Sequence, residues 1–257
     1  MKEALYFVYN GVNSQDLGVT QVQVKQTDLY EEQFMGDITI QEVQIRHKQT
    51  PYFQGVIRTP LTFDLTMAFD QNLFPGCVEL IAQAFFVDNY QPLYVDTDPT
   101  RIWMCMPNGS STITHDGCGR GYITVSMRCD SPYMYRPTFL SEVFTGTTFS
   151  INNDGDLPVS PEIWITKIGN GDISITNQTT GSVFAFTGLL DGEVVYVDND
   201  AEYITSSLEP SNIYRYNNFN DNFMSLAVGK NTFTVTGNCT VQIRMMARLV
   251  TGLVSGF

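Results

Sequence analysis

Strict alternation of apolar and polar residues in two segments is the feature of this sequence that most limits its fold. In LTFDLTMAF (61–69) and YITVSMRCD (122–130), nearly every second residue is apolar. A period of two places these side chains on one face of an extended chain, whereas a helix would distribute them around its axis. Both segments therefore predict half-buried strands. The residues expected to face the core are Leu61, Phe63, Leu65, Met67, Phe69, Ile123, Val125, Met127 and Cys129.

Weaker strand signals lie at Thr20–Val24 and Ile38–Arg46, and one segment has the spacing of a helix. We expect that helix from Pro75 to Val87, with Pro75 in its first turn and apolar residues at helical spacing. It has few polar interior residues. A helix that is apolar on most sides is usually covered by more than its own sheet, which points to assembly.

The chain changes character after Arg136. Short β-rich runs separated by glycine-containing turns follow one another, which is typical of a β-sandwich or barrel. Pro132 and Pro137 favour a short, stiff connection before these runs. We therefore expect two domains, 1–135 and 136–257. The runs are PEIWITKI, GDISITN, SVFAFTGL, GEVVYVD, KNTFTVTG and CTVQIRMMARL.

The charge balance limits the classes of partner. The chain has 14 basic and 27 acidic residues, a net charge of −13. Such a chain repels phosphate backbones, so we expect no specific nucleic-acid binding. We find neither a signal peptide nor a long apolar run, and we expect no membrane insertion. The five cysteines lack metal-type spacing and are expected to be reduced core thiols.

No catalytic, cofactor-binding or metal-binding frame is recognisable, and we expect none of the three. His47 and His115 stand apart in the sequence, without a nucleophile motif or ligand spacing. The acid pairs Asp154/Asp156 and Asp198/Asp200 leave a glycoside hydrolase or a Ca²⁺ loop open, although Asp is also the ordinary turn residue of β proteins. GCGRG (117–121) leads into a strand, so we interpret it as a hairpin turn and not a phosphate loop.

Four segments in this order and spacing resemble the distal tail proteins of long-tailed, non-contractile bacteriophages. They are YFVYNGVNSQDLGV near the start, GVIRTPLTFDL, VSMRCDSPYMYRP before the second domain, and LAVGKNTFTVTG near the end. The resemblance implies a mainly β protein: a tail-tube-like, ring-forming β domain with one helix, followed by a galectin-like β-sandwich.

The resemblance also implies a structural function at the tail tip of the virion. Members form a hexameric ring that joins the tail tube to the tail-tip or baseplate hub and leaves a channel for DNA. The implied partners are further copies of the chain, the tail tube protein, the hub or tail-associated protein and the tape measure protein. Assembly is expected in the host bacterial cytoplasm, and the acidic charge is expected on the channel wall.

Two other function classes remain as alternatives. A carbohydrate-binding module for the host receptor would use exposed aromatic side chains, but Trp103 and Trp164 lie in alternating runs where core packing is expected. A β-rich hydrolase would have to use the acid pairs.

The segment KQTDLYEEQFMGD (25–37) is the predicted contact surface. It lies between two strand signals and places large apolar groups among acids. A long loop of this composition is expected to be covered by a partner. The predicted interface residues are Leu29, Tyr30, Phe34 and Met35.

Overall fold

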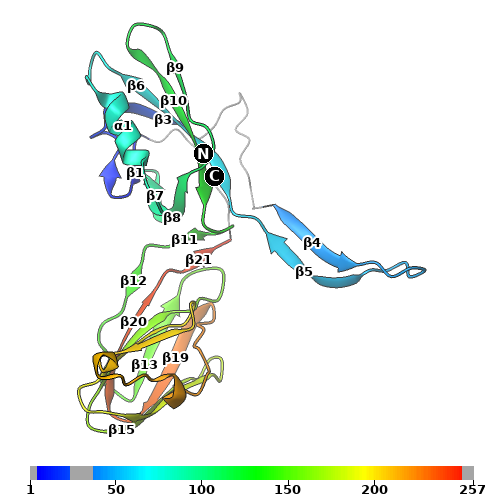
Figure 1. The fold of residues 1–257 in the computed structure, drawn as a ribbon, viewed down its shortest axis with the longest axis vertical. Coiled ribbons are helices and arrows are strands. Elements are labelled where there is room, and N and C mark those ends of the chain that lie inside the picture. The colour runs from blue at the N-terminus through cyan, green and yellow to red at the C-terminus, as the bar shows by residue number, and fades with distance from the viewer. Residues whose placement is uncertain (1–4, 24–36, 251–257) are drawn as a thin grey trace. The chain divides into compact units, whose positions relative to one another are not determined.

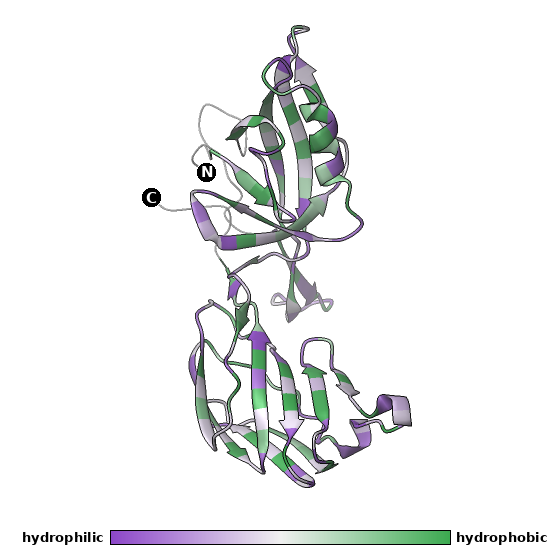
Figure 2. Cartoon of the chain, turned by 90° about the vertical axis from the view of Figure 1, so that its left-hand side faces the viewer, coloured by the Kyte–Doolittle hydropathy of each residue, from purple (hydrophilic) through white to green (hydrophobic). Residues whose placement is uncertain are grey.

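The computed structural model describes residues 5–23 and 37–250. The described chain is mainly β and divides into two compact units, the first ending at Tyr135 and the second covering Arg136–Leu249 (Figure 1). Apolar and polar residues alternate along the strands of both units (Figure 2). The predicted fold class is thus confirmed.

The main sheet of the first unit is antiparallel, with the strand order β2-β1-β7-β8-β10-β6-β3. β9 adds to β10, and β11 adds to β8. The bounds are β1 (Phe7–Tyr9), β2 (Val12–Asn13), β3 (Val19–Gln23), β6 (Thr62–Asp70), β7 (Gln91–Val95), β8 (Asp98–Pro107), β9 (Thr112–His115), β10 (Arg120–Cys129) and β11 (Met134–Tyr135).

β6 and β10 are neighbouring interior strands of this sheet. The two strands run in continuous register from Arg120 opposite Asp70 to Arg128 opposite Thr62. Their alternating apolar residues are buried as expected, except that Phe63 is only half-buried. The opposite face is partly covered as well, because Thr66 is buried and its hydroxyl lies 3.0 Å from that of Thr124.

The helix α1 (Cys77–Phe85) is shorter than expected. It begins after Gly76, whose φ of 82° lies in the left-handed region, so Pro75 precedes the helix instead of occupying its first turn. Phe85 packs the helix against β1. The centre of its ring lies 4.9 Å from that of Tyr9, on which it stacks, and 6.0 Å from that of Phe7. No helix in the described ranges has the length and apolar character needed to cross a membrane.

GCGRG forms the turn between β9 and β10, as predicted. Gly117 and Gly119 have φ values of 75° and 86°, which a side chain would disfavour. The Asp116 carboxylate accepts hydrogen bonds from the Cys118 and Arg120 amides, at 2.7 and 3.2 Å. These bonds hold the pKa of Asp116 below its usual value. The Asp116 carboxylate therefore makes its hydrogen bonds within the turn.

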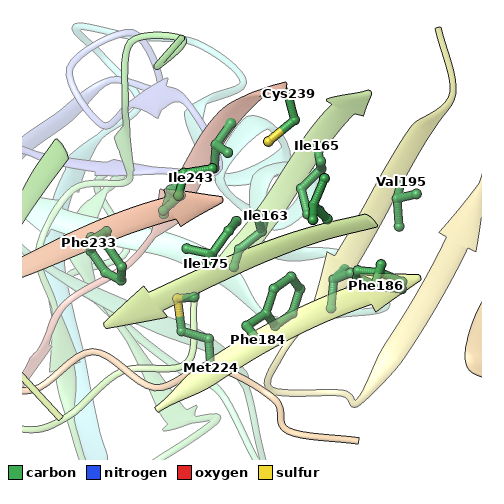
Figure 3. Packing of buried hydrophobic residues seen from close by; sticks show 14 of the residues in the cluster. Ile163, Ile165, Ile175, Phe184, Phe186, Val195, Met224, Phe233, Cys239 and Ile243 are labelled. Atoms are coloured by element: carbon green, nitrogen blue, oxygen red, sulfur yellow. The ribbon is translucent and has the colours of Figure 1, made fainter. Parts of the chain in front are cut away.

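The second unit is a sandwich of two antiparallel sheets. One has the order β12-β20-β14-β17-β18 and the other β13-β19-β15-β16, and their inward residues share one core (Figure 3). The bounds are β12 (Phe139–Leu140), β13 (Thr148–Asn153), β14 (Glu162–Lys167), β15 (Gly171–Asn177), β16 (Val183–Leu189), β17 (Val194–Asp198), β18 (Tyr203–Ser206), β19 (Gly229–Thr236), β20 (Cys239–Met245) and β21 (Arg248–Leu249), with the 3-10 turns η1 (Glu209–Ser211) and η2 (Tyr216–Asn218).

A buried ion pair secures the segment after β18 to this sandwich. Glu193 is fully buried and accepts hydrogen bonds from Arg215 Nε and Nη2, both at 2.7 Å. The Ser206 hydroxyl donates to the same carboxylate at 2.6 Å, and the Leu190 amide at 2.9 Å. Burial alone would raise the pKa of Glu193, but the bonds from Arg215, Leu190 and Ser206 hold it below its usual value.

Replacing Glu193 with Gln should destabilise the protein and flatten its acid dependence. Arg215 would keep a buried charge without its counter-ion, which costs about 3 kcal/mol. Because the pKa of Glu193 is lower in the folded state, its stabilisation is present at neutral pH and is lost as the pH falls through that folded value. Urea unfolding at pH 7 and at acid pH should therefore show a smaller pH effect in the variant.

The exposed acid Glu202, in the same unit, provides the control. Glu202→Gln should leave the urea concentration at half-unfolding nearly unchanged, both at pH 7 and at acid pH. Equal losses for the two variants would contradict the stabilising role of the buried pair.

Candidate assembly surface

A two-stranded hairpin of the first unit leaves its apolar side chains in solvent. β4 (Ile38–Val43) and β5 (Tyr52–Arg58) pair with each other and with no other described strand (Figure 1). Every residue of the two strands is exposed apart from the partly buried Gly55. Phe53 keeps 68% and Ile40 60% of its surface accessible. The other exposed apolar residues of the hairpin are Ile38, Val43, Ile45, Tyr52, Val56 and Ile57.

Both faces of the hairpin carry apolar groups. Ile40 lies opposite Val56 on one face, while Ile57, opposite Thr39, lies on the other. A lone pair of strands has no second layer against which to bury either face, and isolated hairpins are only marginally stable in water. Contiguous exposed apolar surface on a soluble domain marks an interaction site. The hairpin, called the arm below, therefore has the composition of an interaction surface.

The arm is also basic, in contrast to the remainder of the chain. Residues 38–58 contain Arg46, Lys48 and Arg58 against the single acid Glu42. The rest of the sequence then has 11 basic residues (14 less 3) and 26 acidic residues (27 less 1). The Lys48 ammonium lies 3.5 Å from the centre of the Tyr52 ring, a cation–π contact near the tip. An acidic surface would complement this arm.

A second apolar surface lies between α1 and the β9–β10 hairpin. It is a groove of about 340 Å³. Next to it Phe86 keeps 88% of its surface accessible, and Leu80 and Ile113 are also exposed. The helix thus buries one side on its own sheet and offers apolar side chains on another, as its composition indicated. The groove is lined by Val78, Ile81, Ala82, Phe85, Phe86, Pro107, Ser111, Thr112, Ile113, Ile123 and Val125.

The predicted interface residues Leu29, Tyr30, Phe34 and Met35 lie outside the described residues. They remain a prediction. The strand signal at Ile38–Arg46 corresponds to β4, but sequence reasoning missed its partner β5. Aromatic and β-branched residues in TPYFQGVIR were the available signal, although no polar alternation marked a face.

The residues considered for catalysis or metal binding are dispersed. Across residues 5–23 and 37–250, no group of three or more His, Cys, Asp and Glu side chains is arranged to hold a metal ion. The His115 imidazole Nδ1 accepts the Gly117 amide at 3.2 Å, within the turn. The Asp198 carboxylate likewise accepts the amides of Asp200 and Ala201, each at 3.0 Å. His115 and Asp198 therefore make hydrogen bonds that stabilise their own turns.

The two tryptophans differ in position. Trp103 is buried beside Phe63, as expected. Trp164 was expected in the core, but this prediction is wrong: it lies on the outer face of β14, partly exposed, because Ile163 and Ile165 occupy the inward positions. Its ring lies 4.9 Å from that of Tyr196 and 5.2 Å from the Arg244 guanidinium.

Comparisons with known proteins cover almost the whole chain. A family model described as the phage tail protein N-terminal domain matches residues 2–131, and one described as the phage tail C-terminal domain matches residues 137–245. The SPbeta prophage-derived protein YomH of Bacillus subtilis (strain 168) is 28% identical over 249 residues, which cover 95% of this chain and 97% of YomH.

Two solved structures align with this chain at low sequence identity. The Dit protein of phage SPP1, described as a paradigm of the hub adsorption apparatus in phages that infect Gram-positive bacteria, aligns with a TM-score of 0.66 and 12% identity, over 94% of this chain and 98% of that chain. A chain of the phage P2 baseplate in its activated conformation aligns with a TM-score of 0.47 and 8% identity, over 95% and 98%. The predicted resemblance to distal tail proteins is confirmed at the level of the fold.

Thiol chemistry offers a direct check of the first unit and of the sandwich. Cys118 is exposed at its turn, whereas the other four cysteines are buried and none is in a disulfide. Burial raises the pKa of Cys77, Cys105 and Cys239, and that of Cys129 to about 12. A thiol reagent at pH 8 should therefore label one site per native chain quickly, and Cys118→Ser should abolish this fast phase. Several fast-reacting thiols in the folded Cys118→Ser variant would contradict the burial of the other four cysteines.

Proposed function

The chain belongs to a family of phage tail proteins, and from this premise we propose that it is the distal tail protein of a long-tailed phage. Its copies form a closed, hexameric ring at the tail tip. The ring joins the tail tube protein to the tail-tip hub and leaves a channel for DNA. The first domain, 1–135, forms the ring, and the second, 136–257, is the sandwich that it carries.

The exposed β4–β5 hairpin is the observation that carries this proposal. Its apolar residues on both faces require a cover, and a copy of the same chain supplies one at equal concentration. Contact between an arm and a different surface of the next copy is heterologous, so repeating it generates a ring when the rotation closes. A ring leaves no arm uncovered.

The fold likeness supports a position at the tail tip. SPP1 Dit, a hub protein by its description, shares the fold over both units. In this proposal the protein acts as a virion component, assembled in the host bacterial cytoplasm, with the tape measure protein as a further partner. The net charge of −13 supports an acidic channel wall, along which DNA passes without being retained by counterion release.

Substitutions on the arm test the ring. Ile40→Ser, Phe53→Ser and Ile57→Ser together should convert the assembled particle to monomers, because they remove apolar area from both faces of the hairpin. Light scattering would measure the mass, and class averages of the wild type should show six-fold rings. As the matched control, Val143→Ser, Ile168→Ser and Val228→Ser alter exposed apolar residues of the sandwich and should leave the mass unchanged. A wild-type chain that is monomeric at every concentration would contradict the proposal.

Glycan binding is the second candidate, supported by the outer face of β14 and β17. The Tyr196 hydroxyl donates to Glu162 at 3.0 Å, beside the partly exposed Trp164 ring. Aromatic rings next to fixed polar groups suit a sugar ring, although the Arg244 guanidinium lies near the indole. Binding to bacterial wall glycans that Trp164→Ala abolishes would support it. Equal binding by wild type and variant would exclude this surface.

A further inference from the structure

The groove between α1 and the β9–β10 hairpin has walls that favour an apolar occupant. The groove is open to solvent, and its walls are mostly Val, Ile, Phe and Pro side chains. Water in such a groove makes few hydrogen bonds to its surroundings. Replacing it with apolar side chains is favourable, because apolar area leaves water on both partners.

We infer that the groove of one copy is the seat for the β4–β5 hairpin of the next copy. This inference rests on the proposed ring and names the surface on which the arm docks. Phe53, Ile57 and Ile40 are the large exposed groups of the hairpin that can enter a cleft lined by Ile81, Phe85 and Ile123.

Charge distinguishes this seat from other apolar surfaces of the chain. The segment 75–89, which contains α1, has two acids and no Lys or Arg. Glu79 lies on the helix itself and Asp88 just beyond it, and both are exposed. The arm brings Arg46, Lys48 and Arg58. The lining of the groove is uncharged, and the acids Glu79 and Asp88 of the helix segment complement the basic arm.

The two surfaces also satisfy the geometry of a ring. Both belong to the first unit, and they are different surfaces. Each copy therefore donates one arm and accepts one arm. A closed ring covers every arm and every groove once, whereas an open chain leaves one of each in water.

Filling the groove provides the first test. Ala82 lines the groove, and Ala82→Trp should occupy the space that the arm needs. Gln83 is the next residue on the same helix, is exposed, and does not line the groove, so Gln83→Trp is the matched control. We expect Ala82→Trp to weaken assembly by tenfold or more in the concentration at half-dissociation, and Gln83→Trp to leave it within about twofold. Circular dichroism, and fast labelling confined to Cys118 while the four buried cysteines stay protected, would establish that both variants are folded.

A cross-link between copies provides the second test. In the Cys118→Ser background, one preparation would carry Phe53→Cys and the other Ala82→Cys. After mixing, a bis-maleimide should join the two cysteines into a product of dimer mass, and peptide mass spectrometry should identify residues 53 and 82. Replacing Ala82→Cys by Gln83→Cys should lower the yield about tenfold.

The outcomes separate the inference from the proposed function. Rings that persist in Ala82→Trp, with no link between positions 53 and 82, would overturn the groove as the seat and leave the ring standing. In a chain that carries both Phe53→Cys and Ala82→Cys, a link found only within single chains would overturn it too, because the occupant would then belong to the same copy. Absence of any oligomer and of any link would contradict both.

Discussion

An unburied pair of strands is the constraint on which this account depends. The β4–β5 hairpin exposes Ile40 and Phe53 and has no partner strand among the described residues. The sandwich differs: its two sheets bury each other's inward residues completely, as Ile163 and Phe233 illustrate. Each sheet of the sandwich covers the apolar face of the other, so the core of that unit is buried within the chain itself. Among its described residues, the first unit leaves two apolar surfaces exposed, the arm and the groove beside α1.

Charge selects which of these surfaces contacts which. Two exposed apolar patches of the same character would favour any association, including aggregation. Here the basic arm, with Arg46 and Lys48, differs from the acidic helix segment that carries Glu79. Like charges disfavour contact between two basic arms, while the acids of the helix segment favour contact with an arm. A heterologous contact of this kind is what a ring requires.

The sequence predicted those parts in which local pattern and tertiary burial agree. β6 and β10 follow strict alternation, because one face of each packs on a core. β5 was missed since both of its faces are apolar and exposed, so no alternation separates Phe53 from Val56 in character. Trp164 was assigned to the core because alternation shows that two sets of side chains face opposite ways but not which set is buried. The packing of the second sheet on the Ile163 and Ile165 face of β14 decides this. The groove joins residues from α1, β9 and β10, a proximity that no local pattern contains.

Hydrogen exchange of residues 38–58 measures the central claim most directly. The comparison is between the assembled particle and the same protein diluted until it dissociates. Burial of the arm on a neighbouring copy predicts strong protection of the β4 and β5 amides in the particle and its loss on dilution, while the sandwich peptides exchange equally in both. Equal, rapid exchange of β4 and β5 in the assembled particle would show that no partner covers the arm, and would contradict the account.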